Sequence, residues 1–363
     1  MKKYLCMCIS CAFVFFAKAQ EERLRDYVNP FVGTDGYGNI YPGSQIPFGG
    51  IQISPDTDNH FYDAASGYKY SHPTIMGFSL SHLSGTGIPD LGDFLFVPGT
   101  GEIKSIPGTH ENPDEGYRSR YSHEKEWASP GYYGVELIDY GVKAEMTSAC
   151  RSGIFRFTYP ASDKAFILVD LNHTLWQSCP WSNLRQLNDS TIVGYKLVKG
   201  WGPERHIYFA ATFSRKLEHF YILQDGKPVI YNTKRFRSHK EAWGEKLMAC
   251  FTFSTHTGEE VYVKTAISGV STEGALANIN ELDGLTFESV KSRAEELWEK
   301  ELGKYHVAGD LKTKRTFYTS AYHAALHPFV FQDADGRYRE LDKNIGRAEG
   351  FTNYTTFSLW DTY

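Results

Sequence analysis

The chain has 363 residues, of which 41% are hydrophobic and 22% are charged, and its formal net charge is −5. This composition is typical of a globular protein, and the length favours about two domains. Because no extended Lys/Arg cluster is present to bind a phosphate backbone, we expect no nucleic-acid partner. Aromatic residues reach 15%; Tyr and Trp rings suit sugar surfaces, although most aromatics fill β-sheet cores.

The first 19 residues have the three parts of a signal peptide. Lys2-Lys3 form a charged start, Leu5–Phe16 form an apolar stretch, and Ala17-Lys18-Ala19 form a small-x-small cleavage site. The apolar stretch is too short to cross a membrane. We therefore expect no transmembrane segment, cleavage before Gln20, and export to the periplasm, the cell surface or beyond.

The mature chain keeps three cysteines, Cys150, Cys179 and Cys250. Their wide spacing matches neither a disulfide framework nor a zinc site. At most one bridge could form, and buried free thiols are the simpler interpretation.

From about Ile46 to Ala266 the pattern predicts an antiparallel β-sandwich. Short apolar or alternating runs recur between turn signals, without helical periodicity between them. Gly, Pro and Asp concentrate before Tyr133, which predicts long ordered loops of the kind that commonly hold binding sites. The expected strands are Gly134–Ile138, Val142–Met146, Gly153–Tyr159, Ala165–Asp170, Thr191–Val198, His206–Phe213, Leu247–Phe253 and Glu260–Ile267.

The periodicity becomes helical after Gly269. Apolar residues at spacings of three and four predict helices over Thr272–Leu282, Glu288–Leu302 and Lys312–His327, with Gly303 and Pro328 as stop signals. The predicted organisation is a signal peptide (1–19), a β-sandwich domain (20–268), a helical linker (269–305) and the beginning of a helical domain (306–363). The sequence stops at Tyr363 without a turn signal, as if cut within that last domain.

The segment Gly77–Pro98 carries the residues best suited to a polar ligand. Glycines and hydroxyl residues surround His82, Asp90 and Asp93. Two interpretations are open for His82: a hydrogen-bond donor in a ligand-contacting loop, or a buried residue beside a tight turn. Asp90 and Asp93 are either a carboxylate pair, for which glycoside hydrolysis requires a separation of about 5–10 Å, or turn and cap residues.

Three further sequence motifs are considered as functional sites, and each supports a site only weakly. Asp333-Ala-Asp335-Gly336 resembles the start of a calcium loop, but Arg337 and Asn344 stand where further ligands are required, so a surface turn is the better interpretation. Gly33–Gly38 lacks the context of a dinucleotide fingerprint and is interpreted as a loop, perhaps one that faces the same site as His82. No Gly-x-Ser-x-Gly elbow supports a peptidase or esterase.

An ordered set of segments resembles glycoside hydrolase family 92, the calcium-dependent exo-acting α-mannosidases of bacteria. No single segment decides the resemblance, but together the segments run in order over nearly the whole mature chain. They are Tyr27–Thr34, Tyr41–Gly49, Ser66–Tyr70, the His82–Asp93 loop, Gly200-Trp201, Phe317–Pro328, Asp333–Tyr338 and Phe357–Tyr363.

The resemblance implies a β-rich plus α fold: an N-terminal antiparallel β-sandwich, linking helices, and the start of an α/α toroid. It also implies an inverting hydrolysis of terminal mannose from α-mannosides, such as α-1,2 linkages of N-glycans or mannans. The catalytic acid, the catalytic base and most calcium ligands are expected beyond Tyr363. No residue of this chain is therefore assigned as catalytic or as a metal ligand, and the fragment alone is expected to be inactive and poorly soluble.

Residue by residue, the resemblance assigns substrate contacts. Trp360 and Asp361 match a pair that meets the terminal mannose. The turn with His82, Ser84, Gly85 and Gly87 matches the contribution of the N-terminal domain to the pocket. Asp90 and Asp93 are expected to support that turn.

Departures from the family pattern concern the outer subsites. Tyr37-Gly38-Asn39 replaces a His-Gly-His sequence, Phe61–Ala65 replaces a Trp-rich run, and Ile88 replaces a Cys. The first two changes bear on linkage and leaving-group preference. The competing hypothesis is a non-catalytic carbohydrate-binding module, which would bind mannose without turnover.

Overall fold

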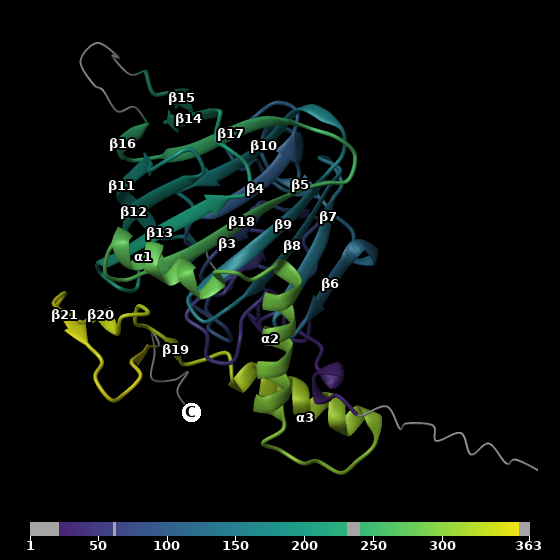
Figure 1. The fold of residues 1–363 in the computed structure, drawn as a ribbon. Helices are drawn as coiled ribbons and strands as arrows, with labels where there is room; N and C mark the ends of the chain where they lie inside the picture. The colour runs from purple at the N-terminus through teal and green to yellow at the C-terminus, as the bar shows by residue number, and fades with distance from the viewer. Residues whose placement is uncertain (1–21, 61–62, 231–239, 356–363) are drawn as a thin grey trace, which may run out of the picture.

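The computed structural model describes residues 22–60, 63–230 and 240–355, and its fold is an antiparallel β-sandwich followed by a helical stretch (Figure 1). One sheet has seven strands in the order β1-β3-β4-β10-β17-β14-β15, and the other has nine in the order β16-β11-β12-β13-β18-β9-β8-β7-β6. The fold class expected from the sequence is confirmed.

The strands of the seven-stranded sheet are β1 (Ser54–Asp56), β3 (Gly77–Ser79), β4 (Leu95–Thr100), β10 (Ser162–Asp170), β14 (His219–Gln224), β15 (Lys227–Pro228) and β17 (Leu247–Thr255). Those of the nine-stranded sheet are β6 (Glu126–Ser129), β7 (Tyr132–Leu137), β8 (Val142–Ser148), β9 (Ser152–Tyr159), β11 (Ser178–Gln186), β12 (Thr191–Lys199), β13 (Arg205–Phe213), β16 (Glu241–Gly244) and β18 (Glu259–Ser268). Three two-stranded sheets pair β2 (Thr74–Ile75) with β5 (Ser119–Arg120), β19 (Phe329–Val330) with β22 (Tyr354–Thr355), and β20 (Arg337–Arg339) with β21 (Ile345–Arg347).

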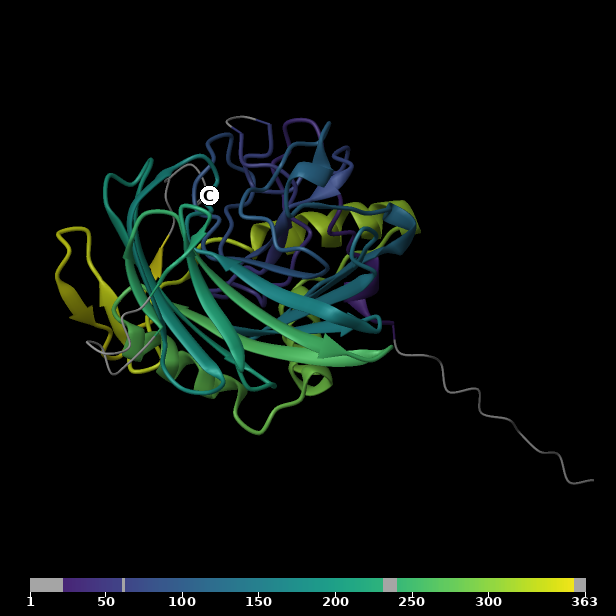
Figure 2. The same cartoon turned by 90° about the horizontal axis from the view of Figure 1, so that it is seen from above.

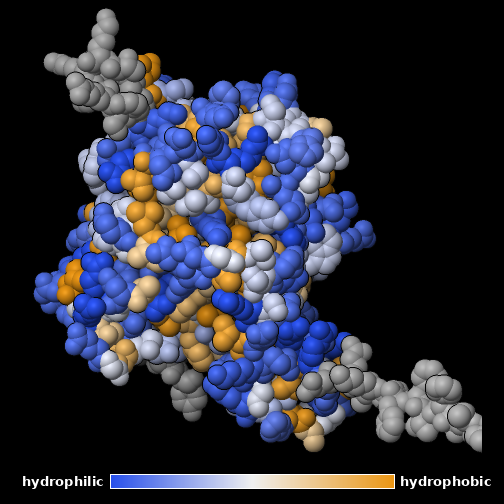
Figure 3. Space-filling view, in the orientation of Figure 1, coloured by the Kyte–Doolittle hydropathy of each residue, from blue (hydrophilic) through white to orange (hydrophobic). Residues whose placement is uncertain are grey.

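The main core lies between the two large sheets. Alternate residues of each strand face it, because successive side chains of a strand point to opposite faces. Its centre is aromatic: Phe155 packs against Phe96 and Phe157, and Phe209 packs against Phe94. The face of the molecule seen in Figure 3 is largely hydrophilic, as expected for the solvent side of such a sandwich.

The three helices are α1 (Thr272–Ile279), α2 (Phe287–Leu302) and α3 (Leu311–Ala324). Ser271 caps α1, whose apolar side covers β13 and β18. Thr286 and Ser289 form a capping box at the start of α2, and Gly303 caps its C-terminal end. All three predicted helices are thus present, the first with a final 3₁₀ turn over Asn280–Leu282 and the third ending three residues early.

The helices hold the loops that precede the sandwich. The indole nitrogen of Trp298 donates to the Gln45 carbonyl at 2.7 Å, and its ring packs on Tyr322 of α3. In Figure 2 the loops of the first hundred residues gather beside α3, at the end of the sandwich where β1, β3 and β4 meet. No helix in the described part of the chain is long and apolar enough to cross a membrane.

The eight strands predicted from the sequence are all present, with ends shifted by a few residues. The predicted free thiols are also observed: Cys150, Cys179 and Cys250 are unpaired, the last two buried and Cys150 half-buried. The predicted signal peptide lies outside the described residues.

Candidate active site loops

The candidate site is built on the connection between β3 and β4. Strand β3 pairs with β1, and residues 80–94 form a long loop before β4 continues the sheet. The base of the loop is closed by backbone hydrogen bonds from Leu80 to Asp93 (2.9 Å) and from Gly92 to Ser81 (2.9 Å). The loop is therefore held at both ends by the sheet, so its tip has a defined position.

His82 lies near the start of this loop, and its side chain is fully buried. Its Nδ1 faces the Gln52 carbonyl at 2.8 Å, and its Nε2 faces Asp56 Oδ1 at 2.7 Å. The other carboxylate oxygen of Asp56 accepts from His173 Nε2 at 2.7 Å. Of the two interpretations of His82, the structure has the buried one: the ring has no accessible atom for a ligand and serves to hold the loop.

Asp56 is the centre of this buried network. Burial alone would raise the pKa of its carboxyl group, but the imidazoles of His82 and His173 outweigh burial and hold that pKa below its usual value. Gly67 makes the close approach feasible, because a Cβ atom built there would lie 2.0 Å from Asp56 Oδ1. The Ser66–Tyr70 segment thus supports the site through its backbone.

Asp93 is the centre of a second buried cluster. Its carboxylate contacts Arg205 at 2.5 Å, Lys196 at 3.1 Å and the Ser81 hydroxyl at 2.7 Å. Burial would raise the pKa of Asp93, but the two cations outweigh it and keep the pKa low. Asp93 is therefore a charged anchor, not a proton donor.

Asp90 supplies the second negative charge of the cluster. It lies 3.8 Å from Arg205, and its carboxylate accepts the backbone N–H groups of Leu91 (2.7 Å) and Trp201 (3.2 Å). Asp90 and Asp93 therefore balance Arg205 and Lys196 in charge. Both carboxylates therefore act as turn and support residues. They are not free to form a catalytic pair.

The tip of the loop forms the exposed rim of the site, defined here as Ser84–Gly87. Gly85 and Gly87 are exposed, and Ser84 and Thr86 are half-buried. Gly85 has a left-handed backbone (φ 77°), and its N–H donates to the Asn39 carbonyl at 2.7 Å. The Gly33–Gly38 loop and its neighbour Asn39 thus adjoin the rim, as the sequence suggested.

Trp360 and Asp361, the predicted sugar-contacting pair, lie outside the described residues. Their contribution to the site stays a prediction.

The surface turn predicted at Asp333–Gly336 is present, but Asp333 itself is buried, which corrects the expectation. Its carboxylate accepts from Ser268 (2.7 Å) and from Asn278 (2.9 Å). Burial raises the pKa of Asp333 above its usual value despite these bonds. With both oxygens engaged and Arg337 following, these residues do not fit a calcium ion.

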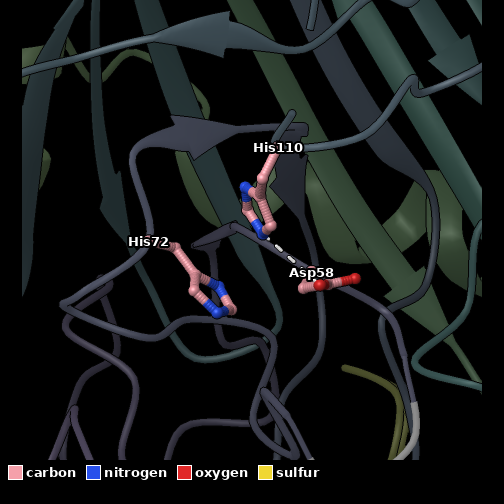
Figure 4. A group of neighbouring side chains, drawn as sticks. All are labelled: Asp58, His72 and His110. Atoms are coloured by element: carbon pink, nitrogen blue, oxygen red, sulfur yellow. Dashed lines mark ion pairs between the residues drawn. The ribbon is translucent and has the colours of Figure 1, made fainter. Parts of the chain in front are cut away.

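A second group with metal-ligand chemistry is Asp58, His72 and His110, whose ligand atoms lie within 4.8 Å of one another (Figure 4). Two imidazoles and one carboxylate suit zinc better than calcium, which prefers oxygen. Arg118 donates to His110 Nδ1 at 2.9 Å, which places the remaining proton on Nε2, 3.4 Å from Asp58 Oδ2. His110 Nε2 is nevertheless buried without a hydrogen bond to any described residue. With two imidazoles among its three members, the group does not fit a calcium site.

Sequence reasoning missed Asp56, His173, Arg205 and Lys196. One signal was present for Lys196: it shares the core-facing side of β12 with Ile192 and Val198, and it is fully buried. A lysine at a core position requires a buried anion. The partner itself could not be identified without the fold.

Comparison with known proteins agrees with this architecture. The model of the glycosyl hydrolase family 92 N-terminal domain matches residues 27–268, and the model of that family's catalytic domain matches residues 274–363. The α-mannosidase BT3965 from Bacteroides thetaiotaomicron, whose structure was solved alone and with mannoimidazole, is 76% identical over 94% of this chain, with a TM-score of 0.92.

More distant relatives have the same arrangement. The family 92 glycosyl hydrolase ccman5 is 26% identical over 93% of this chain, with a TM-score of 0.81. An uncharacterized secreted glycosidase of Arthroderma benhamiae is 25% identical over 83% of this chain. The chain spans 45% of the length of BT3965 and of ccman5, and 41% of the Arthroderma protein.

Proposed function

This chain belongs to glycosyl hydrolase family 92, and on that premise we propose that the whole protein is a secreted α-mannosidase. It removes terminal mannose from α-mannosides, among them α-1,2 linkages of N-glycans or mannans. The observation that carries the proposal is the 76% identity to an α-mannosidase across the sandwich and its loops. The mannoimidazole bound by that relative supports a mannoside as the ligand.

The described residues contribute binding and orientation. The Ser84–Gly87 rim offers the hydroxyls of Ser84 and Thr86 together with backbone groups, and its small residues let a sugar ring approach the backbone closely. The two buried clusters behind the rim keep it fixed, which limits the entropy lost when substrate binds. Trp360 and Asp361 are proposed to complete the contact with the terminal mannose.

The hydrolysis itself is proposed to be inverting. A general acid protonates the leaving oxygen and a general base activates a water on the opposite face of the ring. We place this acid, this base and most of the calcium ligands beyond Tyr363, in the remainder of the helical domain. No step is assigned to the carboxylates described above, because Asp56, Asp93 and Asp90 are engaged in structural ion pairs and hydrogen bonds.

Secretion is supported by the signal peptide predicted over residues 1–19 and by the Arthroderma relative, which is described as secreted. Within this proposal the substrate meets the protein outside the cytoplasm.

The test is proton NMR of the whole protein incubated with α-1,2-linked mannobiose and calcium. The expected result is release of mannose with the β anomer appearing first. Appearance of the α anomer first would contradict the inverting mechanism. Binding of the disaccharide without any mannose release from it or from other α-mannosides would instead favour the carbohydrate-binding module.

A further inference from the structure

A groove opens between the loop that joins β10 to β11 and the segment Asn59-His60. Its lining includes Asn172 and Trp176 from the connecting loop and Ser178 at the start of β11. The groove lies at the same end of the sandwich as the rim, because β10 ends opposite the first residue of β4.

Trp176 is the notable residue of this groove. Its side chain is 53% exposed, and its backbone is left-handed with φ 82°. A bulky residue rarely adopts this conformation, since the Cβ atom then crowds the carbonyl, and such strain persists only where the surroundings fix it. Glycine or asparagine would satisfy the turn at lower cost, so the indole is not explained by local backbone preference.

The neighbours of Trp176 connect it to the rim loop. The Leu175 N–H donates to the Leu91 carbonyl at 3.1 Å, and the Gln177 side-chain amide donates to the Pro89 carbonyl at 2.7 Å. Pro89 and Leu91 belong to the same β3–β4 loop as the rim and follow it closely in the chain. The loop that carries Trp176 is therefore hydrogen-bonded to the loop that carries the rim.

The groove also offers polar groups of the kind that sugar hydroxyls require. Asn59 and Asn172 are half-buried, and His60 and Ser178 are exposed. Gln177 is buried, and its Oε1 has no hydrogen-bond partner among the described residues. An unpaired buried acceptor costs free energy unless a ligand or water donates to it. A flat indole beside several amides and hydroxyls matches a pyranose ring better than an apolar ligand.

We propose that Trp176 is a specificity-determining residue that stacks on the sugar of the leaving-group side, while the rim holds the terminal mannose. The inference rests on the proposed function and adds a residue to it. It predicts that Trp176 matters for substrates with a second sugar and not for substrates without one.

The experiment compares two substrates on the whole protein. α-Mannosyl fluoride has no second sugar, whereas α-1,2-mannobiose has one. Trp176→Ala should lower kcat/KM for mannobiose about tenfold, a typical loss for one pocket contact, and should leave kcat/KM for the fluoride within about twofold. Trp176→Phe, which keeps an aromatic face, should retain most of the mannobiose activity.

Two controls separate stacking from misfolding. Trp127→Ala removes another exposed indole, on the opposite edge strand β6, and should change neither substrate's kinetics. Trp176→Gly removes the ring and relieves the left-handed strain, so it should match Trp176→Ala in kinetics with an equal or higher melting temperature. An equal loss on both substrates, or no loss on mannobiose, would overturn the proposal.

If the whole protein hydrolyses neither substrate, the proposed function is refuted, but the role of Trp176 in binding is not. A binding measurement then tests that role. Titration calorimetry with a sulfur-linked mannobiose, which resists hydrolysis, is compared with methyl α-mannoside. Trp176→Ala should weaken binding of the disaccharide analogue and leave methyl α-mannoside unchanged. Unchanged binding of both would reject the role of Trp176.

Discussion

The floor and the rim of the candidate site are built in opposite ways. The floor consists of polar and charged side chains that are buried or nearly buried and bonded to one another, such as Asp56 with His82 and Asp93 with Arg205. The rim consists of the small residues Ser84–Gly87, of which Gly85 and Gly87 are exposed and have open space around them. The ionisable side chains of this site therefore have structural roles. The groups that a ligand can reach are backbone atoms and the small side chains of the rim.

The largest effect is expected at the floor. Asp93→Ala leaves Arg205 and Lys196 buried without their carboxylate, and breaking such a buried pair costs about 3–5 kcal/mol of stability. Urea denaturation of the whole protein measures the loss. Asp163→Ala, an exposed carboxylate on β10, serves as the matched control and should leave the midpoint unchanged. Similar midpoints for the two variants would show that the cluster does not hold the fold.

Gly67 and Gly85 both have left-handed backbones, so alanine substitutions at the two positions compare the stability of the floor with that of the rim. At Gly85 an added Cβ has open space, so Gly85→Ala should cost only the backbone term of about 1–2 kcal/mol. At Gly67 the added Cβ would also collide with Asp56, so Gly67→Ala should cost more. Denaturation midpoints of both variants provide the measurement. Equal losses would mean that Asp56 is not tightly held.

Low pH should reduce the contribution of the floor to the free energy of unfolding. The pKa values of Asp56 and Asp93 in the folded protein lie below the unfolded value of about 3.9. Their contribution is therefore complete above that value and is lost as the pH falls through it toward the folded pKa values. The free energy of unfolding, followed from pH 7 to pH 3, should decrease at the acid end. Asp93→Asn should show a shallower decrease, and an identical profile would argue against the buried charge.

The smallest effect on stability is expected at Gly87. Its backbone is not left-handed and an added Cβ would meet open space, so Gly87→Ala should leave the melting temperature unchanged. If the rim touches the terminal mannose, the added methyl group should nonetheless raise KM for α-mannosides several-fold. Unchanged KM together with unchanged stability would remove Gly87 from the site.

The sequence predicted the sandwich and helices well because both have a clear period. Strands such as Val142–Met146 alternate, and Val290, Ala294 and Trp298 recur on one face of α2, where all three are buried. The sequence pattern did not predict β11 and β14, because polar residues such as Asn183 and Gln224 interrupt their apolar pattern. The domain boundaries stay predictions.

The candidate site was predictable only in part. Glycines and hydroxyls correctly marked the loop, because backbone conformation is a local property. The role of His82 could not be read from spacing: its partners Asp56 and Gln52 lie 26 and 30 residues away, and His173 reaches the same carboxylate from 117 residues beyond it. Such pairings are set by the sheet and not by neighbours in the chain.

Hydrogen–deuterium exchange with saturating mannoimidazole tests most directly whether the rim, and not the floor, meets the ligand. The whole protein is compared with and without the inhibitor, and exchange is read peptide by peptide. The account predicts slower exchange in peptides that cover Ser84–Gly87, with peptides of the edge strand β6 unchanged. Binding of the inhibitor that leaves the rim peptides unaffected would contradict it.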